Sequence, residues 1–199
     1  NRRTNREIYS STPVPNDALT ALKTATTGFG VAAQMIGDTP EAEWLRDLTW
    51  RAHEMEMISP GPHQESVDLM RIGPKEVAKN PDGIDMEGAM ISAGKLIGVV
   101  NRETLADPNS TAFKQGLDMF RERAQSARAF GWLINDNASR IDQINAGRAY
   151  VRFNLKATEL GLAIHPWSQA LQEYPEMAQI YEELHARIGK GRRVQMLAR

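Results

Sequence analysis

Apolar residues recur every three or four positions in several stretches of the chain, the spacing that places them on one face of a helix. The longest stretch runs from about Ser139 to Leu160, and Gly161 stands where a left-handed C-terminal cap would end the helix. The other helices are predicted over about ten residues after Asp17, over 41–58, over 111–127 and from 173 to 188.

Three short apolar runs, at 130–134, 162–165 and 193–197, are typical of strands. The stretch from 73 to 109 has no clear period and contains a turn-forming segment at 79–83. Helices that alternate with short strands predict an α+β or α/β layer in which helices cover a sheet.

The length of 199 residues suits one domain, or at most two very small ones. We find no internal repeat and no low-complexity linker, so residues 1–199 are predicted to form a single domain. The chain opens at Asn1 without an initiator Met, and it stops inside a predicted strand. We therefore expect it to be a fragment of a longer polypeptide.

The composition excludes several classes of function. The net charge is −1, from 24 Lys and Arg against 25 Asp and Glu, so a general nucleic-acid partner is not expected. The sequence has no cysteine, which excludes disulfides, thiolate metal sites and cysteine nucleophiles. No apolar run approaches the roughly 18 residues needed to cross a bilayer, so no membrane partner is expected either.

The familiar catalytic and metal-binding motifs are also missing. The four histidines lack the i, i+4 spacing that would place two imidazoles on one helical face, so no protein-held metal is predicted. We find no Gly-x-Ser-x-Gly elbow and no glycine-rich phosphate loop of the Walker or dinucleotide type. The four histidines are His53, His63, His165 and His185.

Two segments remain as candidate binding sites. In the first, Arg2, Thr4 and Arg6 suit a phosphomonoester, because guanidinium groups bind phosphate oxygens bidentately. A solvated basic end is the alternative. The second is the loop after the predicted strand at 162–165, in which Trp167 offers an apolar wall and Ser168-Gln169 offers polar groups. Here the alternative is that Trp167 belongs to the core.

Arg148 interrupts the apolar face of the longest predicted helix. It could extend to solvent, reach a ligand, or pair with an acid such as Asp142 or Glu159. We favour the pairing.

Four segments together resemble the nitroreductase family. They are 2–6 followed by Pro-Val-Pro at 13–15, Gln-Ile-Asn-Ala-Gly-Arg-Ala at 143–149, His-Pro-Trp-Ser-Gln-Ala-Leu at 165–171, and Arg-Val-Gln-Met-Leu at 193–197. The last three of these segments are most similar to the C-terminal half of the Acg-like FMN-binding branch. In that branch two nitroreductase-like halves are fused, and many members carry a twin-arginine export signal.

The resemblance implies an α+β fold with a central sheet covered by helices, which pairs with a second copy or with the missing half. FMN would lie at the junction, NADH or NADPH would reduce it, and a nitroaromatic, quinone or similar small molecule would accept the electrons. No catalytic side chain is then required, because the flavin carries the redox chemistry. The implied FMN contacts are Arg2, Thr4 and Arg6 at the phosphate and ribityl end, and Pro166, Trp167, Ser168 and Gln169 beside the ring.

The chain departs from the family pattern at one loop. Where the family has Pro-Ser-Ser-x-Asn after the first helix, residues 26–34 contain Gly28 and Gly30 and no polar fork. This leaves a second hypothesis, a non-catalytic protein that binds or stores flavin in a closed site, and a third, a helical interaction module without cofactor. The compartment would be cytoplasmic, or periplasmic if the full chain has a twin-arginine signal.

Overall fold

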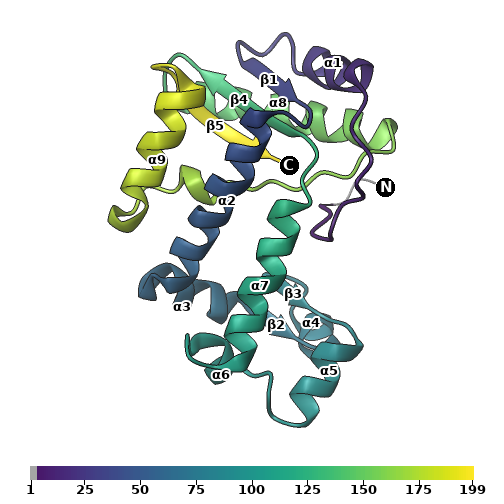
Figure 1. Ribbon diagram of the computed structural model, residues 1–199, viewed down its shortest axis with the longest axis vertical. Helices are drawn as coiled ribbons and strands as arrows, with labels where there is room; N and C mark the ends of the chain where they lie inside the picture. The colour runs from purple at the N-terminus through teal and green to yellow at the C-terminus, as the bar shows by residue number, and fades with distance from the viewer. Residues whose placement is uncertain (1–3) are drawn as a thin grey trace. The chain divides into compact units, whose positions relative to one another are not determined.

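The computed structural model describes residues 4–199, which form two compact units (Figure 1). The first unit contains the residues up to 53 together with 121–199, and the second contains 54–120. The boundaries fall inside two helices, α2 (Pro40–Ile58) and α7 (Thr111–Gln125). Each unit is described by itself.

A three-stranded antiparallel sheet forms the centre of the first unit. Its order is β1 (Ala32–Ile36), β4 (Phe130–Asn135) and β5 (Arg193–Ala198). Every residue of the central strand β4 is buried. The strands predicted at 130–134 and 193–197 are confirmed, whereas β1 was missed because it follows the glycine-containing loop without a long apolar run.

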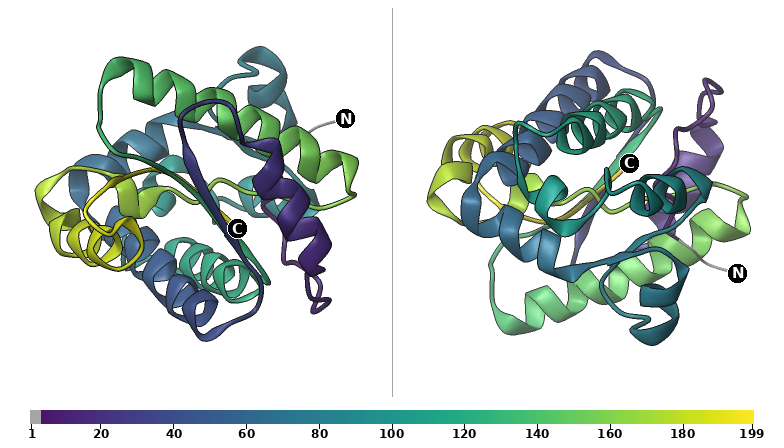
Figure 2. Two further views of the ribbon diagram at one scale, coloured as in Figure 1. Left: turned by 90° about the horizontal axis from the view of Figure 1, so that it is seen from above. Right: turned by 90° about the horizontal axis from the view of Figure 1, so that it is seen from below.

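Helices α1 (Asn16–Ala25) and α8 (Arg140–Glu159) pack against each other over one face of this sheet, and α9 (Ala178–Leu184) lies on the other side (Figure 2). A capping box begins α8: the Ser139 hydroxyl accepts the N–H of Asp142, and the Asp142 carboxylate accepts the N–H of Ser139. Gly161 follows with a φ of +70°, so the predicted left-handed cap is confirmed.

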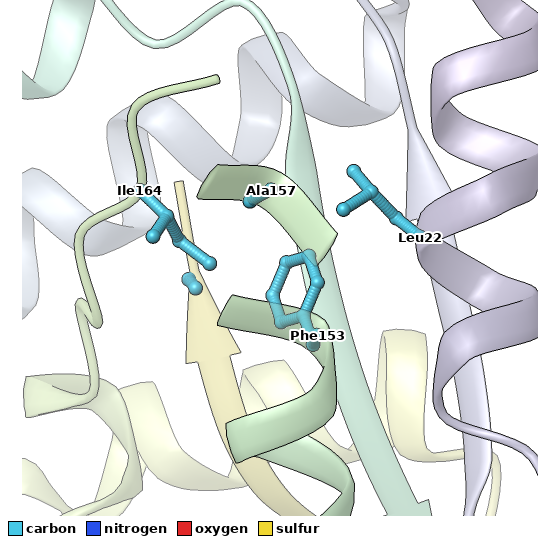
Figure 3. Close-up of a cluster of buried hydrophobic side chains, with 5 residues drawn as sticks. Leu22, Phe153, Ala157 and Ile164 are labelled. Carbon is cyan, nitrogen blue, oxygen red and sulfur yellow. The ribbon is translucent and has the colours of Figure 1, made fainter. Parts of the chain in front are cut away.

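The core of the first unit lies between α1, α8 and the sheet. Leu22 of α1, Phe153 and Ala157 of α8, and Ile164 after α8 meet in one cluster (Figure 3). Gly131 of β4 permits this close packing, because a Cβ there would come within 2.9 Å of the Phe153 ring. A cavity of about 40 Å³ remains beside the cluster.

The segment after α8 pairs with β5 without forming a regular strand. His165 and Arg199 exchange backbone hydrogen bonds of 2.9 and 3.0 Å, and the N–H of Trp167 donates to the carbonyl of Leu197 at 2.9 Å. Pro166 between them forms an isolated bridge with Ala198. The strand predicted at 162–165 is therefore reduced to an extended segment along the outer edge of β5. The short helices that follow are η1 (Gln169–Leu171), η2 (Pro175–Met177) and η3 (His185–Gly189).

The second unit occupies the stretch in which the sequence showed no clear period. Two of its helices begin with a proline in the first turn, a position at which proline is favoured because its missing N–H has no partner to lose there. A two-stranded parallel sheet, β2 with β3, lies among these helices. The elements are α3 (Pro60–Leu69), β2 (Met70–Ile72), α4 (Pro74–Lys79), β3 (Ile84–Met86), α5 (Ala89–Leu96) and α6 (Arg102–Ala106).

Glu76 holds several segments of the second unit together. Its carboxylate accepts hydrogen bonds from Arg102 at 2.8 Å, from Lys95 at 2.7 Å and from the N–H of Ile72 at 3.1 Å. These bonds, the one from Arg102 first, lower the pKa of Glu76 to about 2. Within residues 4–199, none of the helices is both long and apolar enough to traverse a bilayer.

Candidate functional site

The two candidate segments lie side by side in the first unit. The N–H of Asn5 donates to the carbonyl of Ile164 at 3.0 Å, so the start of the described chain runs beside the segment that leads into the loop at 166–169. Arg2 lies outside the described residues. Thr4 is half-buried and Arg6 is exposed, and both flank the Asn5 contact.

Trp167 belongs to the core. Its side chain is 1% exposed, and its indole N–H donates to the carbonyl of Thr49 at 3.2 Å. The edge of its ring packs against His165 at a centroid distance of 5.1 Å and against His53 at 6.2 Å. The structure thus matches the alternative that Trp167 belongs to the core. There it anchors the loop to the protein interior and presents no wall to a ligand.

The other three loop residues, Pro166, Ser168 and Gln169, are half-exposed. Gln169 begins η1, and its side-chain oxygen is buried without a hydrogen-bond partner in the described part of the chain. Buried acceptors are nearly always satisfied, by protein, water or ligand. The Gln169 oxygen is enclosed by the protein, so only the exposed part of this side chain could meet a ligand.

A buried arginine that sequence reasoning missed lies beside the two segments. Arg199 is 5% exposed, and its guanidinium donates to the carbonyls of Arg123 and Glu7 at 2.6 and 3.2 Å. It also donates to the hydroxyl of Ser126 at 3.2 Å and to Nδ1 of His165 at 3.4 Å. An arginine after an apolar strand gives no signal of burial in the sequence, because its partners are backbone atoms distant along the chain.

Aromatic rings cover the faces of this guanidinium. Its central carbon lies 4.3 Å from the ring centre of Tyr9 and 4.7 Å from that of Trp167. Burial lowers the pKa of Arg199 to about 10 and raises that of Tyr9 to about 12. The Tyr9 hydroxyl donates to the carbonyl of Asn5 at 3.0 Å. Arg199 therefore fixes the N-terminal segment through Glu7 and Tyr9.

The electrostatic environment around His165 is positive. Burial first, and then the charges of Arg199, Arg6 and Arg123, lower the pKa of His165 to about 3. The titratable group His53 acts in the same direction. An anion placed among these groups would meet several cations, and His165 itself stays neutral at pH 7.

The loop after α1 borders a surface hollow of about 350 Å³. Thr27 and Phe29 line it from the loop, and Arg152, Leu155 and Lys156 line it from α8. Gly28 and Gly30 have positive φ and no side chain that could replace the polar fork of the family pattern.

The apolar face that identified α8 in the sequence is exposed. Small residues such as Ala146 and Ala149 face the sheet instead, because they allow close packing. Four large apolar side chains form the α8 stripe, with exposed fractions of 56% for Ile141, 45% for Ile144, 53% for Val151 and 48% for Leu155.

The expected pairing of Arg148 with an acid is wrong. Arg148 is exposed in the α8 stripe, and it donates to the side-chain oxygen of Asn145 at 3.2 Å. Asp142 belongs to the capping box, and Glu159 pairs with Lys156 at 2.7 Å. Within residues 4–199, no three His, Asp or Glu side chains come together as a metal site.

No protein-family model matches the sequence, and no curated protein sequence matches it. The chain is similar in structure to a nitroreductase with bound FMN from Bacteroides fragilis, with a TM-score of 0.52 and 15% identity over 99% of this chain and 81% of that one. It is also similar to the FMN-dependent nitroreductase NfnB from Mycobacterium smegmatis in complex with NADPH, with a TM-score of 0.56 and 15% identity over 99% and 82%. The chain thus has the α+β fold of these nitroreductases.

Proposed function

We propose that this protein belongs to the nitroreductase family and is an FMN-dependent oxidoreductase that uses NADH or NADPH to reduce a nitroaromatic, a quinone or a similar small molecule. The observation that carries the proposal is the hydrogen bond from Asn5 to Ile164, which joins the basic segment and the loop at 166–169 within a nitroreductase fold. Bound FMN would supply the redox chemistry, and the protein would bind and orient it.

The residues present fit the phosphate end of FMN. Arg6 is exposed and its positive charge contributes to the low pKa of His165, so the surroundings favour an anion. Thr4 adds a hydroxyl donor on the same segment, and Arg2 would extend the set. Arg199 does not bind phosphate in this proposal, since its donors already bond to Arg123, Ser126, Glu7 and His165.

The loop supports the ring end of FMN less completely. Ser168 and Gln169 are half-exposed. Pro166 would offer an apolar edge, and Trp167 would position the loop without touching the ring. These residues can bind and orient a flavin, and they include no acid or base for proton transfer.

The loop with Gly28 and Gly30 favours a second candidate function, a protein that holds flavin without efficient turnover. Such a protein keeps the phosphate site and lacks part of the ring site. Absorbance spectra of the purified protein distinguish the two functions. Absorbance of protein-bound flavin after incubation with FMN is expected in both. Loss of that absorbance with NADH or NADPH, followed by its recovery with an electron acceptor, is expected only for the oxidoreductase. A sample that binds no FMN contradicts both.

We also propose that a second copy of the chain covers the α8 stripe. An antiparallel copy centred near Arg148 would bury Ile141 of one chain against Leu155 of the other. Arg148 of one chain would then face Arg148 of the other at the centre, so the proposal rests on the exposed apolar side chains of the α8 stripe and not on charge complementarity. A fused second half would cover the same stripe in a monomer.

A further inference from the structure

The cavity beside the core cluster of the first unit has room for a small molecule. Its volume is about 40 Å³, whereas a buried water molecule needs only about 10–15 Å³ of such space. All of its lining residues belong to the first unit, and most of them come from α1, the sheet, α8 and the segment after α8. A guest somewhat larger than water therefore fits.

The wall of this cavity is almost entirely apolar. Leucine, methionine, phenylalanine and alanine side chains form most of it, among them Leu22, Met35, Phe153 and Ala157. A buried water molecule is held by about two to four polar partners, whereas an apolar void stays dry and binds apolar guests such as xenon. The composition of the wall therefore selects against water.

Arg199 supplies the charged side chain in this wall, and its polar atoms are already bonded. Its three guanidinium nitrogens all donate to other groups, which belong to Glu7, Arg123, Ser126 and His165. A guest in the cavity therefore meets no free donor on Arg199, and its contacts with the wall are apolar.

Small residues leave the cavity open. Ala157 of α8 and Ala198 of β5 each present only a methyl group, and both are buried, with exposed fractions of 2% and 1%. The Phe153 ring packs over Gly131 of β4 instead, where an added Cβ would lie 2.9 Å from it. Figure 3 shows Leu22 and Ile164 on either side of this ring.

We propose that this cavity binds a small apolar molecule such as dioxygen. Dispersion contacts with the wall hold the guest, and water does not compete because it would lose its hydrogen bonds there. Ala163, one of the lining residues, is exposed, so the cavity lies close to the protein surface on that side. Residues 162–164 of the wall lead into the loop at 166–169, but the binding of the guest does not depend on FMN.

The first test compares two isoleucines of the wild-type protein by NMR. Dissolved dioxygen is paramagnetic and speeds the relaxation of nearby protons. The methyl protons of Ile164 are expected to show an effect about threefold larger than those of Ile180, because a void concentrates apolar guests and a packed region does not. Ile180 is outside the cavity wall and is slightly more exposed, at 6% against 3%, so access from solvent alone would favour Ile180.

The second test fills the cavity. Saturation with xenon is expected to shift the methyl resonances of Ile164 in the wild type, and Ala157→Val, which adds two methyl groups to the wall, should abolish this shift. Ala178→Val makes the same change at an exposed position of α9 and should respond to xenon as the wild type does. Ala198→Val fills the cavity from β5 and gives the same test if Ala157→Val does not fold.

Three results would overturn the proposal. The first is a dioxygen effect that is equal at Ile164 and Ile180, a comparison that requires no variant. The second is a xenon shift at Ile164 that persists in both filled variants. The third is an ordered water molecule in the cavity of a crystal structure that xenon under pressure does not displace. A protein that binds no FMN would contradict the proposed function and leave these tests unchanged.

Discussion

The guanidinium of Arg199 donates to Nδ1 of His165 at 3.4 Å, while the backbones of the same two residues exchange hydrogen bonds. The side-chain bond requires Nδ1 to be an acceptor, so His165 is neutral, as its pKa of about 3 also indicates. The buried Arg199 and the neutral His165 are thus joined by both side-chain and backbone hydrogen bonds.

Replacing Arg199 is expected to destabilise the first unit. In Arg199→Met, the Glu7 carbonyl, the Arg123 carbonyl and the Ser126 hydroxyl lose their bonds to the guanidinium, and we expect the free energy of unfolding to fall by about 3 kcal/mol. Urea unfolding measures this free energy. Arg192→Met is the matched control, because its 3.8 Å ion pair with Asp136 is largely exposed and should contribute less than about 1 kcal/mol. Equal losses in both variants would show that Arg199 does not connect these segments.

Stability is expected to fall as the pH is lowered from about 6.5 towards 4. Burial, the larger cause in both cases, lowers the pKa of His165 to about 3 and that of His53 to about 4. Below its ordinary pKa of about 6.5, each histidine takes up a proton in the unfolded chain but not in the folded one. The unfolded state then binds more protons, so each group removes about 1.4 kcal/mol of stability per pH unit.

Urea unfolding at several pH values measures this slope. His53→Gln and His165→Gln should each show a shallower loss between pH 6 and pH 4.5 than the wild type, whatever their stability at pH 7. If both variants lose unfolding free energy with falling pH as steeply as the wild type, the pH dependence does not come from His53 and His165.

Arg6→Ala is expected to weaken FMN binding by about ten- to a hundredfold, because a charge-assisted bond to phosphate is lost. Riboflavin has no phosphate, so its affinity should not change in this variant. Arg192→Ala, a change of the same kind away from the N-terminal segment, should leave both affinities unaltered. Equal weakening for FMN and riboflavin would place the contact of Arg6 elsewhere than on phosphate.

Ile144→Asp and Val151→Asp are expected to convert a dimer into a monomer, because each places a charge within the α8 stripe. Sedimentation velocity measures the mass, and circular dichroism checks that the variants fold. Met119→Asp, which changes another exposed apolar residue that is 41% exposed, should remain dimeric. A wild type that is monomeric at micromolar concentration would exclude the second copy as the partner.

Local signals predicted much of the first unit. The sequence of α8 has a capping box at Ser139 and a glycine at its end, and β4 is a continuous apolar run, so both are identifiable without tertiary context. The second unit could not be predicted in the same way, because its helices are short and ion pairs around Glu76 hold them together.

The candidate site was only partly predictable. The basic segment and the loop at 166–169 were found from residue type, and their contact through Asn5 and Ile164 needed the fold. Arg199 was missed because it bonds to backbone carbonyls, which no side-chain pattern reports. The exposed side of α8 was the one with the clearest apolar period, since the buried side is made mostly of alanines.

Pro166 determines how the sheet ends at this edge. Its neighbours His165 and Trp167 donate their N–H groups inward to β5, so the outward-facing position between them belongs to a residue that has no N–H to offer. A strand arriving from another molecule would find no donor there. Together with Asn5, whose N–H occupies the outward carbonyl of Ile164, the proline makes this edge a poor template for edge-to-edge pairing, right beside the loop that we propose for the cofactor.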